Sequence, residues 1–568
     1  MTFCPPPANI FVMRNFALRL SIVATILVAA PLFAAGRANH VVVVVWDGMR
    51  PDFISAEHTP ALAQLAREGV FFANHHSVYC SATDVNGAAI ATGAYPAHSG
   101  IIGNNEFRPD INPLMPVITA VPEVIRKGDK VSHGHFLLRP TVAEILQAAG
   151  KTTAIAGTKT VALLHDRRER AADSPSVVVF EGKVLPATRL AAITNQLGAF
   201  PKPPTNNQPH TARNEWTRRA LTKVLWSNGV PAYSLLWLSE PDVSQHATGP
   251  GSPRALAAIE GSDQQLAAVL AELDKRKLRD QTDVFVVSDH GFSTIDKSAD
   301  VAAVLRAAGF RARREFAARP KPGDILVVGQ GGSVFFYVTG HDADVTQRLV
   351  KFLQQQDFSG VLFARKKAAG TFPLAAAHLD SSNPPDVILS LHWSPDKSAN
   401  GTPGLYFCDG GVKGAGSHAS FSRFDIHNTL VAAGPDFKSG FTNELPSANS
   451  DLAPTVLQLL GVKPKQPMDG RVLSEALTIP SPNVGQPTAE RLEATTTNGA
   501  VVWKQYLQTS RVNDTVYLDE GNGSAMNRPS ERRLQAAATD KTTLLPPEGG
   551  VPIFSQTEIE GSGDTPAR

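Results

Sequence analysis

A carboxylate and an imidazole stand side by side in the middle of the chain. Asp289 and His290 follow the apolar residues 284–287, and Gly291 comes directly after them. A short apolar run that is bounded by polar residues and Gly predicts a buried strand of a parallel sheet. Ligands of such sheets gather just beyond the carboxyl ends of the strands. The pair is therefore typical of a metal site, although Asp and His also adjoin each other by chance in many proteins.

The same arrangement recurs twice elsewhere in the sequence. Residues 41–45 form an unbroken apolar run that leads into Asp47. The run Tyr233–Leu238 leads to Asp242 and, four residues later, to His246. Because the carboxyl ends of parallel strands meet at one edge of a sheet, the three predicted strands would deliver their polar groups to the same place.

A further imidazole, His418, lies in the Gly-rich segment 413–418. The resulting set contains three Asp and three His and could bind two metal ions: Asp47, Asp242, His246, Asp289, His290 and His418. Mixed His and carboxylate ligation suits zinc, and other divalent ions are alternatives. The sequence has no Cys-x-x-Cys spacing, which excludes thiolate ligation of the metal. Of its three Cys, Cys80 and Cys408 either form a disulfide or remain free and buried.

Thr83 has the position of a nucleophile. It opens the predicted helix 84–92, and a helix N-terminus favours a nearby anion. A metal ion lowers the pKa of a hydroxyl that it binds, which makes an alkoxide accessible at neutral pH. Thr is also a common helix N-cap, and the position in the sequence does not separate the two roles.

Alternating strands and helices must position these residues. Apolar runs predict further strands at residues 70–74, 152–156, 324–328, 333–338 and 430–433. Apolar residues at helical spacing predict helices at residues 60–68, 84–92, 141–149, 253–277, 343–355 and 451–460. The first helix should begin after Thr59 and stop at Gly69, whereas residues 103–135 lack periodicity and are expected to form a long loop or a small insertion near the site. The alternation predicts an α/β fold with a doubly wound, mostly parallel central sheet flanked by helices.

Length and composition favour one large catalytic domain. The chain has 568 residues, a net charge of +2, 42% hydrophobic residues and 19% charged residues. These are globular values, and the charge gives no indication of a nucleic-acid partner. Because the ligand candidates extend from residue 47 to residue 418, we expect a catalytic domain over residues 37–478, with a smaller α+β cap inserted at about 295–400. Residues 479–568 would form a partly disordered C-terminal extension.

The N-terminus has the pattern of a secretory signal peptide. Arg14 and Arg19 lie at the start of an apolar stretch that ends in small residues near position 35. The stretch is short for a membrane-spanning helix, which needs about 20 apolar residues, although an uncleaved anchor is the alternative. We expect a signal peptide over residues 1–36, export to the periplasm or outside the cell, and no stable membrane anchor. The sequence does not predict the oligomeric state.

An ordered set of motifs resembles the alkaline phosphatase superfamily, and within it the nucleotide pyrophosphatase/phosphodiesterase branch. The resemblance covers about residues 40–475 and its motifs are, in chain order, Asp47-Gly48, Thr83-Asp84-Val85-Asn86, Thr92-Gly93-Ala94-Tyr95-Pro96, Gly100-Ile101-Ile102-Gly103-Asn104, Asp242 with His246, Asp289-His290, and Gly416-Ser417-His418. It implies a metal-dependent phosphoric ester hydrolase, expected to be a phosphodiesterase or nucleotide pyrophosphatase, with a small phosphate ester as its partner.

The resemblance also assigns roles to residues. It implies that one zinc ion is held by Asp242, His246 and His418, and the other by Asp47, Asp289, His290 and Thr83. Thr83 would attack phosphorus and form a phospho-threonine, which water then hydrolyses. Asn104 stands where this branch places a side-chain amide against a phosphate oxygen.

Two departures from the family pattern bear on the substrate. Many members have Lys-Thr-Phe-Pro-Asn around the nucleophile, whereas here Asp84 follows Thr83. A monoesterase branch holds its dianionic phosphate with Lys-x-Arg, whereas here Lys159 is present and Val161 stands in place of the Arg. Lys159 is therefore a candidate phosphate ligand without a guanidinium partner. A diester carries one negative charge and needs fewer cationic partners, so we favour a diester substrate.

Other activities of the superfamily are alternatives. Phosphomonoesterase and phosphonoacetate hydrolase activities are compatible with the same ligands and nucleophile. A sulfatase requires Pro and Arg after its Cys or Ser, and the residues after Cys80 include neither. A non-catalytic secreted binding protein is a remote alternative, because the ligand set and Thr83 are all present.

Overall fold

Three parallel strands form the centre of the molecule. The computed structural model describes residues 1–4, 36–205, 207–480 and 484–527, so nearly all of the expected signal peptide and the end of the C-terminal extension lie outside the described residues. β1 (His40–Trp46) lies between β9 (Tyr233–Leu238) and β10 (Thr282–Val287), and all three run parallel. They are buried along nearly their whole length, as expected for continuous apolar runs in a parallel sheet.

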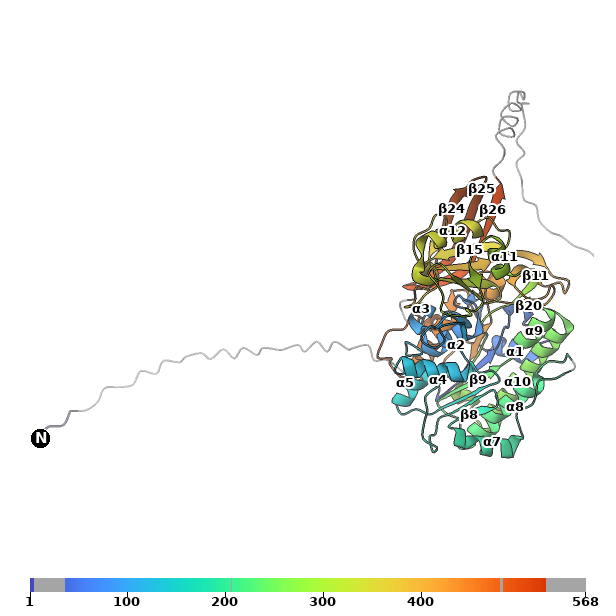
Figure 1. The fold of residues 1–568 in the computed structure, drawn as a ribbon. Helices are drawn as coiled ribbons and strands as arrows, with labels where there is room; N and C mark the ends of the chain where they lie inside the picture. Colours follow the sequence, from blue (N-terminus) through green and yellow to red (C-terminus); the bar gives the residue numbers. More distant parts are fainter. Residues whose placement is uncertain (5–35, 206, 481–483, 528–568) are drawn as a thin grey trace, which may run out of the picture.

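Six further strands extend this sheet on both sides. The order is β22-β2-β21-β10-β1-β9-β6-β7-β8. The added strands are β2 (Val70–Phe72), β6 (Thr153–Gly157), β7 (Val177–Phe180), β8 (Lys183–Leu185), β21 (Leu430–Ala433) and β22 (Phe441–Asn443). β21 is antiparallel to both of its neighbours and β8 is antiparallel to β7, whereas the other pairs are parallel. The predicted α/β fold with a mostly parallel central sheet is confirmed (Figure 1).

Helices cover both faces of the sheet. Successive side chains of a strand point to opposite faces, so Val43 of β1 enters one hydrophobic core and Val44 enters the other. The first core is completed by α2 (Thr83–Thr92), α5 (Val142–Ala148) and α14 (Leu452–Leu459), and the second by α1 (Pro60–Glu68), α8 (Thr211–Arg219) and α10 (Pro253–Lys275). Further helices of the main part are α3 (Pro96–Ser99), α6 (Ala162–His165), α7 (Leu190–Leu197), α9 (Asp242–Thr248) and α13 (Arg423–Ile426).

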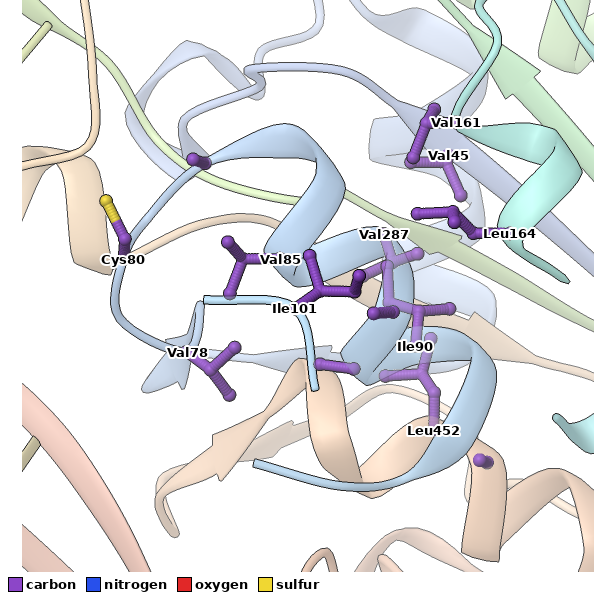
Figure 2. Packing of buried hydrophobic residues seen from close by; sticks show 14 of the residues in the cluster. Val45, Val78, Cys80, Val85, Ile90, Ile101, Val161, Leu164, Val287 and Leu452 are labelled. Atoms are coloured by element: carbon purple, nitrogen blue, oxygen red, sulfur yellow. The ribbon is translucent and has the colours of Figure 1, made fainter. Parts of the chain in front are cut away.

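α2 is buried on every side (Figure 2). Its residues Val85 and Ile90 pack in a cluster with Val45, Val287, Ile101, Leu164 and Leu452. A helix without a polar outer face belongs inside the core. This packing fixes the N-terminus of α2, which carries Thr83, beside the end of the sheet.

Gly69 ends α1, but its role is not that of the usual left-handed helix C-cap that its position suggests. Its φ is −124°, so it does not adopt the left-handed conformation of a usual helix C-cap. A Cβ at this position would lie 2.2 Å from the backbone oxygen of Ala432 in β21. Gly is therefore required by the close approach of two backbones. Thr59 is the N-cap residue as predicted, but its Oγ1 bonds to Ser55 instead of to the first turn.

Of the two alternatives expected for residues 103–135, a single long loop is wrong, because the segment contains regular elements. The segment contains the two-residue strands β4 (Asn105–Glu106) and β5 (Val117–Ile118), which pair with each other, and the helix α4 (Pro122–Val131). Gly128 lowers the helix propensity of the α4 segment, so the sequence does not indicate a helix there. The structure needs Gly there because a Cβ would lie 2.1 Å from the ring of Phe136.

A smaller α+β unit follows β10 in the chain. Its six-stranded sheet has the order β12-β13-β14-β17-β15-β16. The elements are α11 (Val301–Ala307), β12 (Ala312–Arg313), β13 (Ile325–Gly329), β14 (Ser333–Val338), α12 (Ala343–Leu353), β15 (Ser359–Ala364), β16 (Phe372–Pro373) and β17 (Val387–Leu391). A four-stranded sheet adjoins it in the chain and consists of β11 (Ser293–Ala299), β18 (Trp393–Lys397), β19 (Pro403–Asp409) and β20 (Gly416–Ser417).

Three long C-terminal strands join this unit to the main sheet region. β24 (Thr488–Asn498), β25 (Val501–Val512) and β26 (Thr515–Asn527) form an antiparallel sheet (Figure 1). Trp503 of β25 enters the core of the α+β unit, and the amide of Gln505 bonds to the backbone N–H and C=O of Leu362 at 2.8 and 3.0 Å. Tyr517 of β26 donates to Asp451, at the start of α14, at 3.0 Å. The C-terminal strands thus contact both parts of the protein.

We predict that Asp283 in β10 makes stability depend on pH. Burial and the neighbouring Asp436 raise the pKa of Asp283 to about 8, and its Oδ2 is buried without a hydrogen-bond partner among the described residues. A carboxyl group with a raised pKa stabilises the fold at low pH and loses this contribution as the pH rises through the folded-state pKa. The Tm of the wild type should therefore fall more between pH 5 and pH 9 than the Tm of Asp283→Asn. The control is Asp274→Asn, which removes an exposed carboxylate on α10, and parallel profiles for wild type and Asp283→Asn would contradict the prediction.

Candidate active site

The carboxyl ends of β1, β9 and β10 meet at one edge of the central sheet. Asp47 directly follows β1, and Asp289 and His290 follow β10. Asp242 opens α9 after β9, and His246 lies one turn later on the same face of that helix. The three apolar runs therefore bring their polar groups together, as the sequence analysis expected from the strand ends.

The first group of polar atoms surrounds Asp47. The Nε2 atom of His290 lies 3.3 Å from Asp289 Oδ2 and 3.7 Å from Asp47 Oδ1. The ligand atoms of these three buried residues lie within 4.8 Å of one another, which is close enough to hold one metal ion.

The second group surrounds Asp242. Its Oδ1 atom lies 3.2 Å from His246 Nε2 and 3.8 Å from His418 Nε2. The ring of His418 stacks on that of His290 with centroids 3.7 Å apart, so the two groups adjoin each other. His290 is close enough to Asp242 and His418 to count with either group. The structure thus brings together all six residues that the sequence singled out as ligands.

The donor set fits divalent metal ions. Asp47 Oδ1, Asp242 Oδ1 and Asp289 Oδ2 are buried and accept no hydrogen bond within the described part of the chain. Buried carboxylate oxygens without donors are costly unless a cation faces them.

The three imidazoles are turned so that their Nε2 atoms face the carboxylates. The Nδ1 atom of each imidazole contacts a backbone carbonyl oxygen. The distance from His290 to the carbonyl of Gly291 is 2.8 Å, that from His246 to Gly416 is 3.1 Å, and that from His418 to Ser81 is 2.9 Å. Contacts of this kind fix the tautomer and the ring orientation of metal-binding His.

Without metal, the electrostatics of the site disfavour the ionised forms of Asp47 and Asp289. For Asp242 the effect of burial is outweighed by the neighbouring Lys159, which holds the pKa of that carboxyl well below its usual range. Burial raises the pKa of Asp47, and the neighbouring Asp289 raises it further. Burial also raises the pKa of Asp289, to about 7. Burial lowers the pKa values of His290 and His418, which keeps both imidazoles neutral and able to bind a metal. Metal binding would therefore displace protons from the carboxyl groups.

Lys159 follows β6. Among the described residues, it is the one Lys or Arg whose side chain contacts these carboxylates. Its Nζ lies 2.6 Å from Asp242 Oδ2 and 2.9 Å from Asp47 Oδ2. Burial alone would lower the pKa of this ammonium group, but Asp242 and Asp47 raise it above its usual value. Lys159 is therefore charged and lies between the two ligand groups.

Thr83 is the first residue of α2, and its hydroxyl faces the ligands. Its Oγ1 lies 3.2 Å from His290 Nε2. The N-cap of α2 is Ala82, so the alternative that Thr83 is only a helix N-cap is wrong. Two asparagines support this turn: Asn86 bonds to the backbone of Val78 and Ala82, and Asn449 donates to Asn86 Oδ1 and to the carbonyl of Asp289.

Asn104 adjoins the same helix end. Its Oδ1 accepts a hydrogen bond from the backbone N–H of Asp84 at 2.8 Å. Because the oxygen of the amide is bonded to α2, the Nδ2 group of Asn104 points away from this backbone N–H. The carboxylate of Asp84 accepts hydrogen bonds from Thr119 Oγ1 and from the backbone N–H of Ala120. Asp84 thus anchors the segment that follows β5, and its carboxylate is engaged there.

Sequence reasoning missed two supporting residues. The indole Nε1 of Trp237 donates to Asp47 Oδ2 at 2.8 Å, and Asn449 links Asn86 to the backbone of Asp289. Trp237 lies inside an apolar run, and Asn449 precedes a helix without any motif, so neither gave a signal. Cys80 and Cys408 are both buried and free, which answers the question of their pairing.

Comparison with known sequences identifies this arrangement. Residues 41–397 match the family described as type I phosphodiesterase/nucleotide pyrophosphatase. The chain belongs to this family. Its membership confirms the resemblance to the phosphodiesterase branch of the alkaline phosphatase superfamily, and it makes the protein a phosphoric ester hydrolase.

Relatives of this phosphodiesterase family member are distant. Ectonucleotide pyrophosphatase/phosphodiesterase family member 7 of Homo sapiens is 22% identical over 81% of this chain and 93% of its own. Bis(5′-adenosyl)-triphosphatase enpp4 of Mus musculus is 21% identical over 46% of this chain and 49% of its own. Among solved structures, an inactive variant of murine ectonucleotide pyrophosphatase/phosphodiesterase 5 in complex with AMP has a TM-score of 0.54 and 17% identity, over 77% of this chain and all of that one. That likeness shows the shared fold.

We predict that Trp237 supports metal binding by this phosphodiesterase. Trp237→Phe keeps most of the packing but removes the N–H that holds Asp47 Oδ2, and loss of such a partner typically costs 10- to 100-fold in metal affinity. Metal affinity should fall about tenfold, as measured by competition with a chelating dye. The matched control is Trp226→Phe, which removes the hydrogen bond to Ser234 Oγ. Equal metal affinities for the two variants would contradict the prediction.

Proposed function

We propose that this protein hydrolyses phosphate diesters, including nucleotide pyrophosphates, through a phospho-threonine at Thr83. The observation that carries the proposal is the 3.2 Å contact between Thr83 Oγ1 and His290 Nε2 at the N-terminus of α2. It sets a hydroxyl group against the six-residue ligand set, at a helix end that favours anions.

Two zinc ions suit the ligand set. The first would be held by Asp47, Asp289 and His290 beside Thr83, and the second by Asp242, His246 and His418. Nitrogen and carboxylate donors of this kind are typical of zinc, and other divalent ions are compatible with them. Bound zinc supplies Lewis acidity, which stabilises negative charge on the reacting oxygens and favours ionisation of a hydroxyl group.

The chain's own residues then perform two displacements at phosphorus. Thr83 Oγ1 gives its proton to solvent and forms a bond to phosphorus, while the bond from phosphorus to the leaving oxygen breaks and that oxygen keeps the electron pair and takes up a proton according to its pKa. A water molecule next gives up a proton and forms a bond to phosphorus, while the bond to Thr83 Oγ1 breaks and Oγ1 takes up a proton, which restores the threonine. The buried α2 holds Thr83 in one position for both steps.

Asn104 and Lys159 would contact the phosphoryl group. The Oδ1 of Asn104 is engaged by the backbone of α2, so its Nδ2 is the group that would donate to a phosphate oxygen. Lys159 lies against Asp242 and Asp47, and no guanidinium follows it at Val161. This set offers few cationic donors besides the metals, which favours a monoanionic diester over a dianionic monoester.

Two further assignments are part of the proposal. The catalytic domain would cover residues 37–478 with a cap at about 295–400, followed by an extension over 479–568. The protein would be exported, because residues 1–36 have the pattern of a signal peptide and the human relative is named as an ectonucleotide pyrophosphatase/phosphodiesterase. Within the described part of the chain, no helix combines the length and the hydropathy that a membrane span needs.

Replacement of Thr83 tests the nucleophile. Thr83→Ala should lower kcat for bis(4-nitrophenyl) phosphate by at least about 1,000-fold, because it removes the oxygen that attacks phosphorus in the proposed first step. Metal content should stay near that of the wild type, as measured by mass spectrometry of the purified protein. Thr83→Ser keeps the hydroxyl and should retain much more activity. Substantial turnover by Thr83→Ala would mean that water attacks phosphorus directly.

A comparison of esters tests the substrate class. The kcat/KM for an aryl phosphate diester should exceed that for the matching monoester in the wild type. Lys159→Ala should reduce activity toward both, because Lys159 also balances the charge of Asp47 and Asp242. A strong monoester preference that disappears in Lys159→Ala would instead identify a phosphomonoesterase in which Lys159 binds the dianion.

A further inference from the structure

A buried carboxylate in α13 connects the two segments that continue from His290 and His418. The Oδ1 atom of Asp425 accepts a hydrogen bond from Ser293 Oγ at 2.6 Å. Its Oδ2 atom accepts from the backbone N–H of Ser420 at 3.0 Å and from the hydroxyl of the same residue at 2.6 Å. Ser293 lies three residues after His290. Ser420 lies two residues after His418, so one side chain holds both segments close to a metal-ligand candidate.

The backbone of α13 holds the first of these segments a second time. The N–H of Gly291 donates to the carbonyl of Asp425 at 2.8 Å. The N–H of Phe292 donates to the carbonyl of Phe424 at 2.7 Å. A Cβ at Gly291 would lie 2.1 Å from the backbone oxygen of Phe424. The helix is therefore packed directly against the residue that follows His290.

The second segment contains a residue with an unfavourable backbone conformation. Ala419 has a φ of 75°, in the left-handed region that suits Gly and that a Cβ disfavours. Relaxation of Ala419 to a negative φ would turn the preceding residue, His418, away from its position. Hydrogen bonds on both sides oppose this relaxation: the N–H of Gly332 donates to the carbonyl of His418 at 2.8 Å, and Asp425 holds Ser420. Backbone strain of this kind persists only where the surrounding contacts enforce it.

The two imidazoles held in this way form a contact between the two ligand groups. His290 belongs to the group around Asp47, and His418 belongs to the group around Asp242. Their rings stack with centroids 3.7 Å apart. The placement of one group against the other therefore depends on the two segments that Asp425 connects.

We propose that Asp425 is a positioning residue for the metal centre, which holds Ala419 in its left-handed conformation and thereby fixes His418 against His290. The inference rests on the proposed function, because it concerns the two metal ions assigned there. Asp425 acts on the ions through the ligand segments, so its loss should weaken metal binding without removing a ligand. Loss of a group that orients metal ligands typically costs 10- to 100-fold in metal affinity.

The zinc affinity of the full-length protein, measured by competition with a chelating dye, tests this role. Asp425→Ala removes the three hydrogen bonds to the carboxylate, and the affinity should fall about tenfold. Asp425→Asn keeps an acceptor oxygen in a side chain of the same shape, and its affinity should fall only about threefold. The matched control is Asp263→Ala, which removes a buried carboxylate that accepts from the backbone N–H groups of Ala61 and Leu62 and should leave zinc affinity unchanged.

A double substitution separates positioning from a general effect on stability. Gly adopts a positive φ without strain, so Ala419→Gly removes the tendency of this segment to relax. In the Ala419→Gly background, Asp425→Ala should therefore cost only about threefold in zinc affinity instead of about tenfold. Equal factors in the two backgrounds would overturn the inference. If Asp425→Ala does not fold, Ser420→Ala, which removes one of the three hydrogen bonds, gives the same comparison with smaller factors.

The same titrations distinguish failure of the inference from failure of the proposed function. Failure of the wild type to bind zinc or another divalent ion would refute the proposed metal centre, and the positioning role would fall with it. Zinc binding by the wild type together with an equal affinity in Asp425→Ala would refute only the positioning role.

Discussion

Three carboxylates are buried together at the end of the central sheet, and the rest of the site depends on how their charge is balanced. Two unit charges about 4 Å apart repel each other by about 4 kcal/mol at the effective dielectric of a protein. Lys159 contacts Asp47 and Asp242 but supplies only one positive charge. Two divalent ions together with Lys159 would outweigh the three carboxylates. A site that holds both ions would then carry a net positive charge, which suits an anionic substrate.

The scaffold holds five of the six ligands with neutral groups, whereas Asp242 is bonded to the charged Lys159. Backbone carbonyls hold the imidazoles, the Trp237 indole holds Asp47, and the amide of Asn449 holds the backbone of Asp289. Asn449 is itself held by the buried His75, whose pKa burial lowers to about 3, so that it stays neutral. Because these supports carry no net charge, they orient the ligands without adding to or cancelling the charge that attracts the metal.

The sequence predicted the centre of the fold well, and it predicted that the six candidate ligands lie together, for a physical reason. Strands such as Tyr233–Leu238 are buried on both faces, so their apolar runs are unbroken and their ends are marked by polar residues. The features that it did not predict depend on contacts between distant segments. Gly128 looks like a helix breaker until Phe136 is seen against it, and Gly69 looks like an ordinary C-cap until the oxygen of Ala432 is seen beside it. The sequence likewise gives no indication that the Trp237 indole contacts Asp47.

The wide separation of the ligands in sequence has a consequence for how the protein matures. The second ligand group joins Asp242 to His418, and the first joins Asp47 to Asp289, so each closes a very long loop. Folds dominated by contacts between residues distant in sequence form slowly, because the entropy cost of closing the loop comes before the stabilising contacts. No short stretch of the described chain contains a complete ligand group, so a nascent or half-folded chain would bind a metal ion only weakly. Metal binding would thereby be coupled to the completion of folding, and bound ions would stabilise only the folded protein.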